Sequence, residues 1–122
     1  NKAQEEKFKI ALYDANLAED GKKVFKKCKS CHQIGEEAKN RSGPMLNNII
    51  GAQFASVPGY KYSSAFKKAN KAGLIWTEEE MAKFLTKPKK YIKGTKMYFS
   101  GLKKESDTTA VIEYLKSVGI KK

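Results

Sequence analysis

Residues that build most metal and redox sites are scarce in this 122-residue chain, which has one histidine, His32, and two cysteines, Cys28 and Cys31. A structural zinc site takes four cysteine or histidine ligands, more than the chain contains. A redox disulfide of the thioredoxin kind is accompanied by a βαβ pattern, and strand-like alternation of apolar and polar residues is rare here. Zinc binding and thiol redox chemistry are therefore the weaker interpretations of the cysteine pair.

Arginine is nearly absent, because Arg41 is the only one among 25 basic residues. With 13 acidic residues, the formal net charge is +12. Such an excess attracts nucleic acid, an anionic membrane surface or an acidic protein face. Proteins that bind nucleic acid favour arginine for its bidentate contacts, so the lysines favour steering toward an acidic protein. A basic nucleic-acid module is the disfavoured alternative, and we expect no nucleic-acid partner.

Long apolar runs are missing too. No stretch approaches the roughly 20 apolar residues of a membrane-spanning helix, and no signal peptide is recognisable. The length corresponds to one domain. We therefore expect no membrane span in this chain. We also expect the chain to act as a monomer.

The pattern of apolar residues predicts an all-α fold of about four to five helices joined by long loops. We expect helices at five places along the chain, 3–13, 19–31, 63–72, 77–86 and 106–118. Ser63 and Thr77 are residue types that cap helices, and Thr77 with Glu80 has the signature of a capping box. The connections 33–62 and 87–105 are long for so small a domain, which indicates that they wrap around a bound group.

The strongest local pattern is Cys-Lys-Ser-Cys-His, in which Cys28, Cys31 and His32 occupy positions i, i+3 and i+4. On a helix these positions share one face. Both thiols can then reach the two vinyl groups along one edge of a porphyrin, and the histidine can bind the iron. This is the pattern of c-type haem attachment, so we predict one covalently attached haem c.

The second axial ligand cannot be another histidine of this chain, because His32 is the only one. Thioether bonds use both cysteines, which leaves a methionine, a lysine, a tyrosine or no ligand. Met81 lies on the apolar face of an expected helix and Met45 follows His32 closely, so we interpret both as core residues. Met97 lies far along the chain, in a loop that can cross to the opposite haem face. We predict that Met97 is the ligand.

Ligation by His32 and Met97 predicts an electron carrier. A thioether ligand favours Fe(II) and raises the reduction potential. With both axial positions filled, no position is open for a substrate or for oxygen. An iron that changes charge without changing ligands also needs little rearrangement, so we expect no enzymatic activity.

The chain resembles the class I cytochromes c, the family of mitochondrial cytochrome c and its small bacterial periplasmic relatives. The resemblance covers about residues 18–118, and its motifs follow one another at 21–25, 28–32, 43–46, 58–60, 73–76 and 88–99. It implies the class I cytochrome c fold, with helices and loops wrapped around one haem. It also implies that Gly21, Phe25 and Tyr114 form the contact between the first and last helices of the family fold.

The resemblance further implies roles around the haem. The Pro44 carbonyl would accept the ring N–H of His32, and Tyr62 and Trp76 would hydrogen-bond the buried propionate. Phe99 would cover the haem beside the methionine ligand. Beyond the attachment motif, the haem-binding residues are then Pro44, Tyr62, Trp76, Thr95, Met97 and Phe99.

The chain departs from the family pattern at several points. Phe84 stands where mitochondrial members usually carry a tyrosine that hydrogen-bonds the axial sulfur, and Ala52 stands where an arginine commonly supports the propionates. The stretch between Tyr62 and Trp76 is also longer, as in some bacterial members. A loosened Met97 would favour the alternative function, a haem enzyme or sensor in which peroxide or a gas displaces that ligand.

Lysines occur on both sides of the expected haem edge. By resemblance, the family docks acidic faces of partner proteins at Lys27, Lys89, Lys90, Lys96, Lys103 and Lys104. The implied partners are a quinol-oxidising cytochrome complex and a terminal oxidase or another acceptor. The implied compartment is the bacterial periplasm, with the mitochondrial intermembrane space as the alternative.

The N-terminal segment extends beyond the usual start of the family. We expect residues 1–16 to form an extension that docks through Phe8 and Leu12, and residues 17–122 to form the cytochrome c domain.

Overall fold

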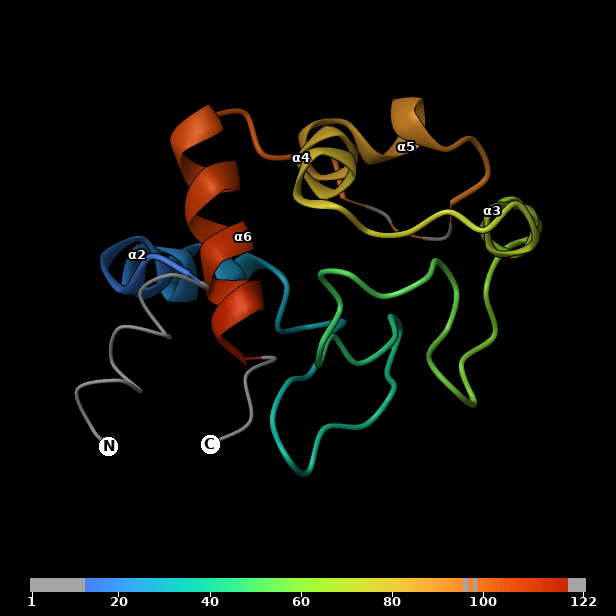
Figure 1. The fold of residues 1–122 in the computed structure, drawn as a ribbon, viewed down its shortest axis with the longest axis horizontal. Helices are drawn as coiled ribbons and strands as arrows, with labels where there is room; N and C mark the ends of the chain where they lie inside the picture. The colour runs from blue at the N-terminus through green and yellow to red at the C-terminus, as the bar shows by residue number, and fades with distance from the viewer. Residues whose placement is uncertain (1–12, 96, 98, 119–122) are drawn as a thin grey trace.

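A computed structural model describes residues 13–95, 97 and 99–118 of the chain. These residues form an all-α fold in which the only bridge between extended segments is an isolated one, Gln53 with Ile75. In chain order the elements are α2 (Ala15–Val24), the 3-10 turn η1 (Phe25–Lys27), α3 (Ser64–Lys71), α4 (Glu78–Thr86), α5 (Pro88–Tyr91) and α6 (Glu105–Val118). The predicted all-α class is confirmed (Figure 1).

The helix expected at 19–31 is wrong at both ends. It begins at Ala15, because the Asp14 carboxylate accepts the backbone N–H groups of Asn16 and Leu17 at 3.0 and 3.1 Å. An aspartate in this position is a strong N-cap. The α-helix ends at Val24 and tightens into η1, so the cysteine motif follows the helix and is not its last turn.

The caps expected for α3 and α4 are present, but the capping box is only half formed. Ser63 caps α3, and the Thr77 hydroxyl accepts the N–H of Glu80 at 3.1 Å. The reciprocal bond is missing, because the Thr77 N–H donates to the Ile75 carbonyl instead. The Glu80 carboxylate accepts the hydroxyl of Tyr91, which lies on α5.

A short helix, α5, lies inside the connection 87–105 that we expected to be a loop. Pro88 occupies its first turn, where the missing N–H of proline costs nothing. The last helix begins at Glu105, one residue before the expected start.

The helices α2 and α6 cross (Figure 1), and Gly21 lies at the crossing, as the resemblance implies. A Cβ atom at Gly21 would lie 2.0 Å from the Ala110 carbonyl oxygen and 2.8 Å from Tyr114 Cβ. The ring of Phe25 packs against Tyr114 with centroids 5.5 Å apart. Only glycine therefore allows the two helix backbones to approach this closely.

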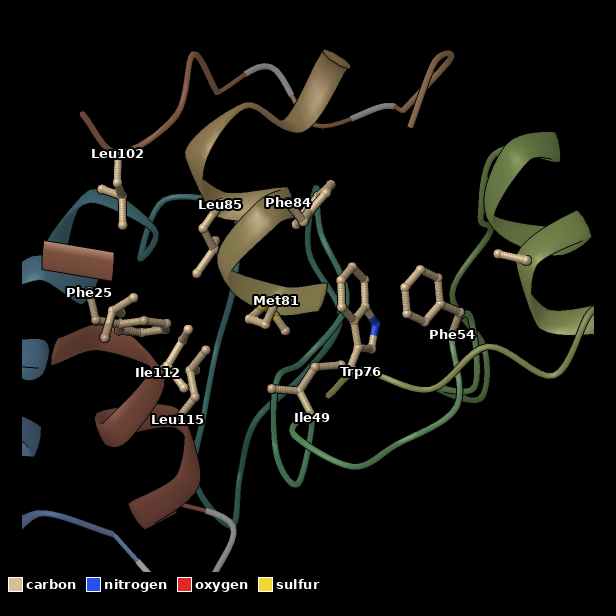
Figure 2. Close-up of a cluster of buried hydrophobic side chains, with 12 residues drawn as sticks. Phe25, Ile49, Phe54, Trp76, Met81, Phe84, Leu85, Leu102, Ile112 and Leu115 are labelled. Atoms are coloured by element: carbon tan, nitrogen blue, oxygen red, sulfur yellow. The ribbon is translucent and has the colours of Figure 1, made fainter. Parts of the chain in front are cut away.

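An aromatic and aliphatic core lies between α4, α6 and the central loops (Figure 2). The Trp76 indole stacks on Phe54 at 3.8 Å between centroids and lies 5.2 Å from the Phe84 ring. Met81 is buried in this core, as predicted. Met45, also predicted to be a core residue, is only half-buried and does not belong to the buried cluster.

The loop 28–63 contains neither a helix nor a strand, and side-chain amides bond its backbone at several places. Asn47 donates to the Gly35 carbonyl at 2.7 Å and accepts the Gly35 N–H at 2.9 Å. Asn40 accepts the Met45 N–H at 3.0 Å and donates to the Pro58 carbonyl at 3.1 Å. These bonds take the place of a sheet ladder and give the long loop a defined path.

Several expectations fall outside the described residues. The helix expected at 3–13 lies outside the described residues except for its last residue. The expected docking of Phe8 and Leu12 lies outside them as well. The division between residues 1–16 and 17–122 stays a prediction. Over the part of the chain that the structure describes, no helix is both long enough and apolar enough to cross a membrane.

The α2–α6 crossing gives a first test. We expect Gly21→Ala to lower the free energy of unfolding by about 1–3 kcal/mol, because the added methyl group overlaps the α6 backbone. Denaturant unfolding of the haem-loaded protein measures this loss. Lys22→Ala, at the next and exposed position of α2, is the matched control, and equal stabilities of the two variants would contradict the packing argument.

Candidate haem-attachment site

The motif residues 28–32 form one helical turn directly after η1. The N–H groups of Cys31 and His32 both donate to the Cys28 carbonyl, at 3.1 and 2.9 Å. The shared face expected from the spacing is therefore present, although α2 has already ended. Both cysteines are half-buried free thiols, and burial, with a smaller effect of Cys31, raises the pKa of the Cys28 thiol. Two free thiols on one turn fit the need of two thioether bonds.

The His32 ring has one nitrogen occupied and one left for a metal. Its Nδ1–H donates to the Pro44 carbonyl at 2.7 Å, as expected. Burial lowers the pKa of His32, and the hydrogen bond to Pro44 partly offsets this effect. The imidazole is therefore neutral at pH 7, and its Nε2 lone pair is free, which is the state that binds iron.

Gly43 makes the space for the ring. A Cβ atom at this position would lie 2.2 Å from His32 Cε1 and 2.7 Å from Nδ1. The Gly43 N–H donates to the Cys31 carbonyl at 2.8 Å, which holds the loop against the motif. From the sequence, Gly43 was predicted only as a turn and motif residue, and its contact with the ring was not. The signal it missed was a glycine directly before the proline whose carbonyl accepts the histidine.

The other predicted ligand lies in the segment after α5. Met97 and Phe99 are half-buried and both pack against the core cluster. The Met97 N–H donates to the Thr95 hydroxyl at 3.3 Å. The structure thus brings Met97 and Phe99 to the core, and the Thr95 hydroxyl bonds the backbone at the methionine.

Tyr62 and Trp76 lie in one group of rings. The Tyr62 hydroxyl accepts the Val57 N–H at 3.1 Å, so its own proton remains for another acceptor. Phe66 lies between Tyr62 and Trp76, with centroids 6.2 Å from each. The binding of a propionate by both residues stays a prediction.

Two of the departures from the family pattern, Phe84 and Ala52, are visible in the packing. Phe84 is buried among the rings of Trp76, Phe66 and Tyr91, so no hydroxyl is present at this place. The Ala52 carbonyl accepts the backbone N–H of Trp76 at 2.8 Å. The Ala52 side chain has no charge that could pair with a propionate carboxylate.

Exposed lysines gather around α4, α5 and the start of α6. Five of the six lysines predicted to dock partners are exposed: Lys27, Lys89, Lys90, Lys103 and Lys104. The sixth, Lys96, lies outside the described residues. A shallow groove between these helices is lined by Lys90 and Lys103, together with Lys83 and Lys87, which the prediction omitted.

Comparisons with known proteins agree with this geometry. The family model described as "Cytochrome c" matches residues 18–119. Cytochrome c2 of Afifella marina is 46% identical over 102 residues, which cover 84% of this chain and 82% of the relative. Cytochrome c2 of Agrobacterium tumefaciens is 48% identical over 95 residues, 78% of this chain and 86% of the relative.

A solved structure supports the fold as well. The structure of cytochrome c2 from Rhodospirillum centenum superposes with a TM-score of 0.79 at 35% identity, covering 83% of this chain and 97% of that one. The predicted class I fold is thereby confirmed. The chain belongs to the cytochrome c family, whose members bind haem c covalently and carry single electrons.

Proposed function

We propose that this cytochrome c carries one electron at a time through a haem c attached at Cys28 and Cys31, with His32 and Met97 as axial ligands. The haem supplies the Fe(III)/Fe(II) couple when bound. The observation that carries the proposal is the hydrogen bond of 2.7 Å between His32 Nδ1 and the Pro44 carbonyl, on a turn with two free thiols.

The residues around His32 hold its ring in one orientation. The Pro44 carbonyl fixes the tautomer and makes Nε2 more basic. Gly43 packs so closely against the ring that any side chain at this position would displace it. A ligand held in this way keeps its position when the iron changes charge, which keeps the reorganisation during electron transfer small.

Met97 completes the proposed ligand set. Its half-buried side chain packs on the core. With both axial positions filled by the protein, no position is left for a substrate, so we favour a carrier over an enzyme. Phe84 is the one observation in favour of the second candidate, a haem enzyme or sensor, because it gives the sulfur no hydrogen bond.

The exposed lysines support docking to acidic faces of redox proteins. We propose a quinol-oxidising cytochrome complex as donor and a terminal oxidase or another protein as acceptor, in the bacterial periplasm. A surface of one sign raises association rates by about 10- to 1,000-fold and does so less at high salt. The chain would work as a monomer with a small, quickly released interface.

Replacement of Met97 tests the ligand set. We expect Met97→Ala to abolish the weak far-red absorption band that a methionine–iron bond gives to ferric haem, because the thioether is gone. Met45→Ala, which removes another half-buried methionine, should keep the band. A far-red band that survives in the Met97 variant and disappears in the Met45 variant would overturn the assignment.

The space at Gly43 gives a test of the histidine side. We expect Gly43→Ala to displace the His32 ring, and so to change the paramagnetic NMR shifts of its protons and to destabilise the holoprotein by about 1–3 kcal/mol. Gly51→Ala is the control, because its added Cβ meets no atom within 4 Å although its φ of +93° strains the backbone. Unchanged His32 shifts in the Gly43 variant would refute the role of the glycine.

The docking surface has its own test. We expect the variant Lys103→Gln/Lys104→Gln to react about tenfold more slowly with a cytochrome bc1-type quinol-oxidising complex at low ionic strength, with the difference vanishing at high salt. Lys67→Gln/Lys68→Gln, on α3, removes the same charge elsewhere. Docking at the predicted lysines is wrong if both double variants slow the reaction equally.

A further inference from the structure

The segment that carries Met97 leaves α4 and returns to it. Residues 88–101 follow the last turn of α4, and the Leu102 N–H then donates to the Leu85 carbonyl at 2.8 Å. At Gly101 the backbones touch, since a Cβ there would lie 2.0 Å from the Thr86 carbonyl oxygen. We call residues 88–101 the Met97 loop. Its two ends are thus fixed at the C-terminal end of α4 (Figure 1).

A second attachment joins the Met97 loop to the opposite end of the same helix. The Tyr91 hydroxyl donates to the carboxylate of Glu80, which lies in the first turn of α4. The failed capping box leaves this carboxylate free for the bond, because the Thr77 N–H is satisfied elsewhere. Lys83 adds an ion pair to the other carboxylate oxygen of Glu80 at 3.6 Å.

The Tyr91 ring is fixed as well as its hydroxyl. It stacks on Trp76 at 6.3 Å and meets Phe84 edge to face at 5.9 Å. Burial, and next the bond to Glu80, raises the pKa of Tyr91, while the same bond holds the pKa of Glu80 below its ordinary value. At neutral pH the pair therefore consists of a protonated phenol and an ionised carboxylate, which is a charge-assisted hydrogen bond.

We propose that Tyr91 and Glu80 are positioning residues for the axial thioether. Their bond holds the first part of the Met97 loop, the short helix α5, on α4. The inference rests on the proposed ligation by Met97. Tyr91 acts through the backbone that leads to Met97 and is not itself a ligand. Phe84, which packs against the Tyr91 ring, has no hydroxyl that could hold the sulfur directly.

The test uses the ferric holoprotein at neutral pH and imidazole as an external ligand. Imidazole can bind the iron only after Met97 has moved away, so its apparent affinity and its limiting binding rate report how often the loop opens. We expect Tyr91→Phe, which keeps the stacked ring, to raise the population of the open loop about tenfold, as the loss of one charge-assisted hydrogen bond implies. Glu80→Ala should act in the same direction.

A double-mutant cycle and two controls sharpen the result. If Tyr91 and Glu80 act only through their bond to each other, the Met97 loop of the double variant Tyr91→Phe/Glu80→Ala should open no more often than that of the more affected single variant. Glu79→Ala removes an adjacent exposed carboxylate of α4, and Lys83→Ala removes only the ion pair. Both controls should bind imidazole as the wild type does.

The outcomes separate this inference from the proposed function. A wild-type protein without the far-red methionine band would refute ligation by Met97, and with it the inference. A wild-type band together with equal imidazole binding in Tyr91→Phe and Glu79→Ala would refute the positioning role alone. Imidazole binding to Tyr91→Phe that is faster only to the extent that the whole variant unfolds faster would also refute the positioning role.

Discussion

The hydrogen bond between the His32 ring and the Pro44 carbonyl is the interaction on which the rest of the site depends. It needs the turn 28–32 to place the ring, and it needs Gly43 to leave the ring room. One bond therefore connects the attachment turn after η1 with the loop that follows it. The same bond keeps the ring proton on Nδ1, so that in the neutral imidazole Nε2, the proposed iron-binding nitrogen, has the free lone pair.

A small domain with long loops faces the problem of satisfying its backbone without sheets. This chain solves it with side-chain amides in the loop 28–63 and with close backbone contacts at Gly21 and Gly101. The two helices α2 and α6 form one body, and α4 carries the Met97 loop on its two ends. The proposed axial ligands thus come from two different parts of the chain, the turn after η1 and the segment attached to α4, which meet at one core cluster.

Periodicity and the cysteine spacing were enough to predict the all-α class, the attachment turn and the buried position of Met81. Local rules failed where a side chain had two possible partners. The pair Thr77 and Glu80 has the signature of a capping box, yet the carboxylate bonds Tyr91, eleven residues further along the chain, and no local pattern reveals that choice. The early start of α2 depends on the cap that Asp14 forms, and the role of Gly43 depends on its contact with the His32 ring. The periodicity of apolar residues shows neither.

In the proposed carrier, the His32 nitrogen and the Met97 thioether hold the iron in both oxidation states. X-ray absorption at the iron edge of the purified holoprotein tests it most directly. We expect one sulfur in the first coordination shell, besides the nitrogen ligands, in the oxidised and in the reduced protein. A shell without sulfur in either state, or one that loses its sulfur on oxidation, would contradict it.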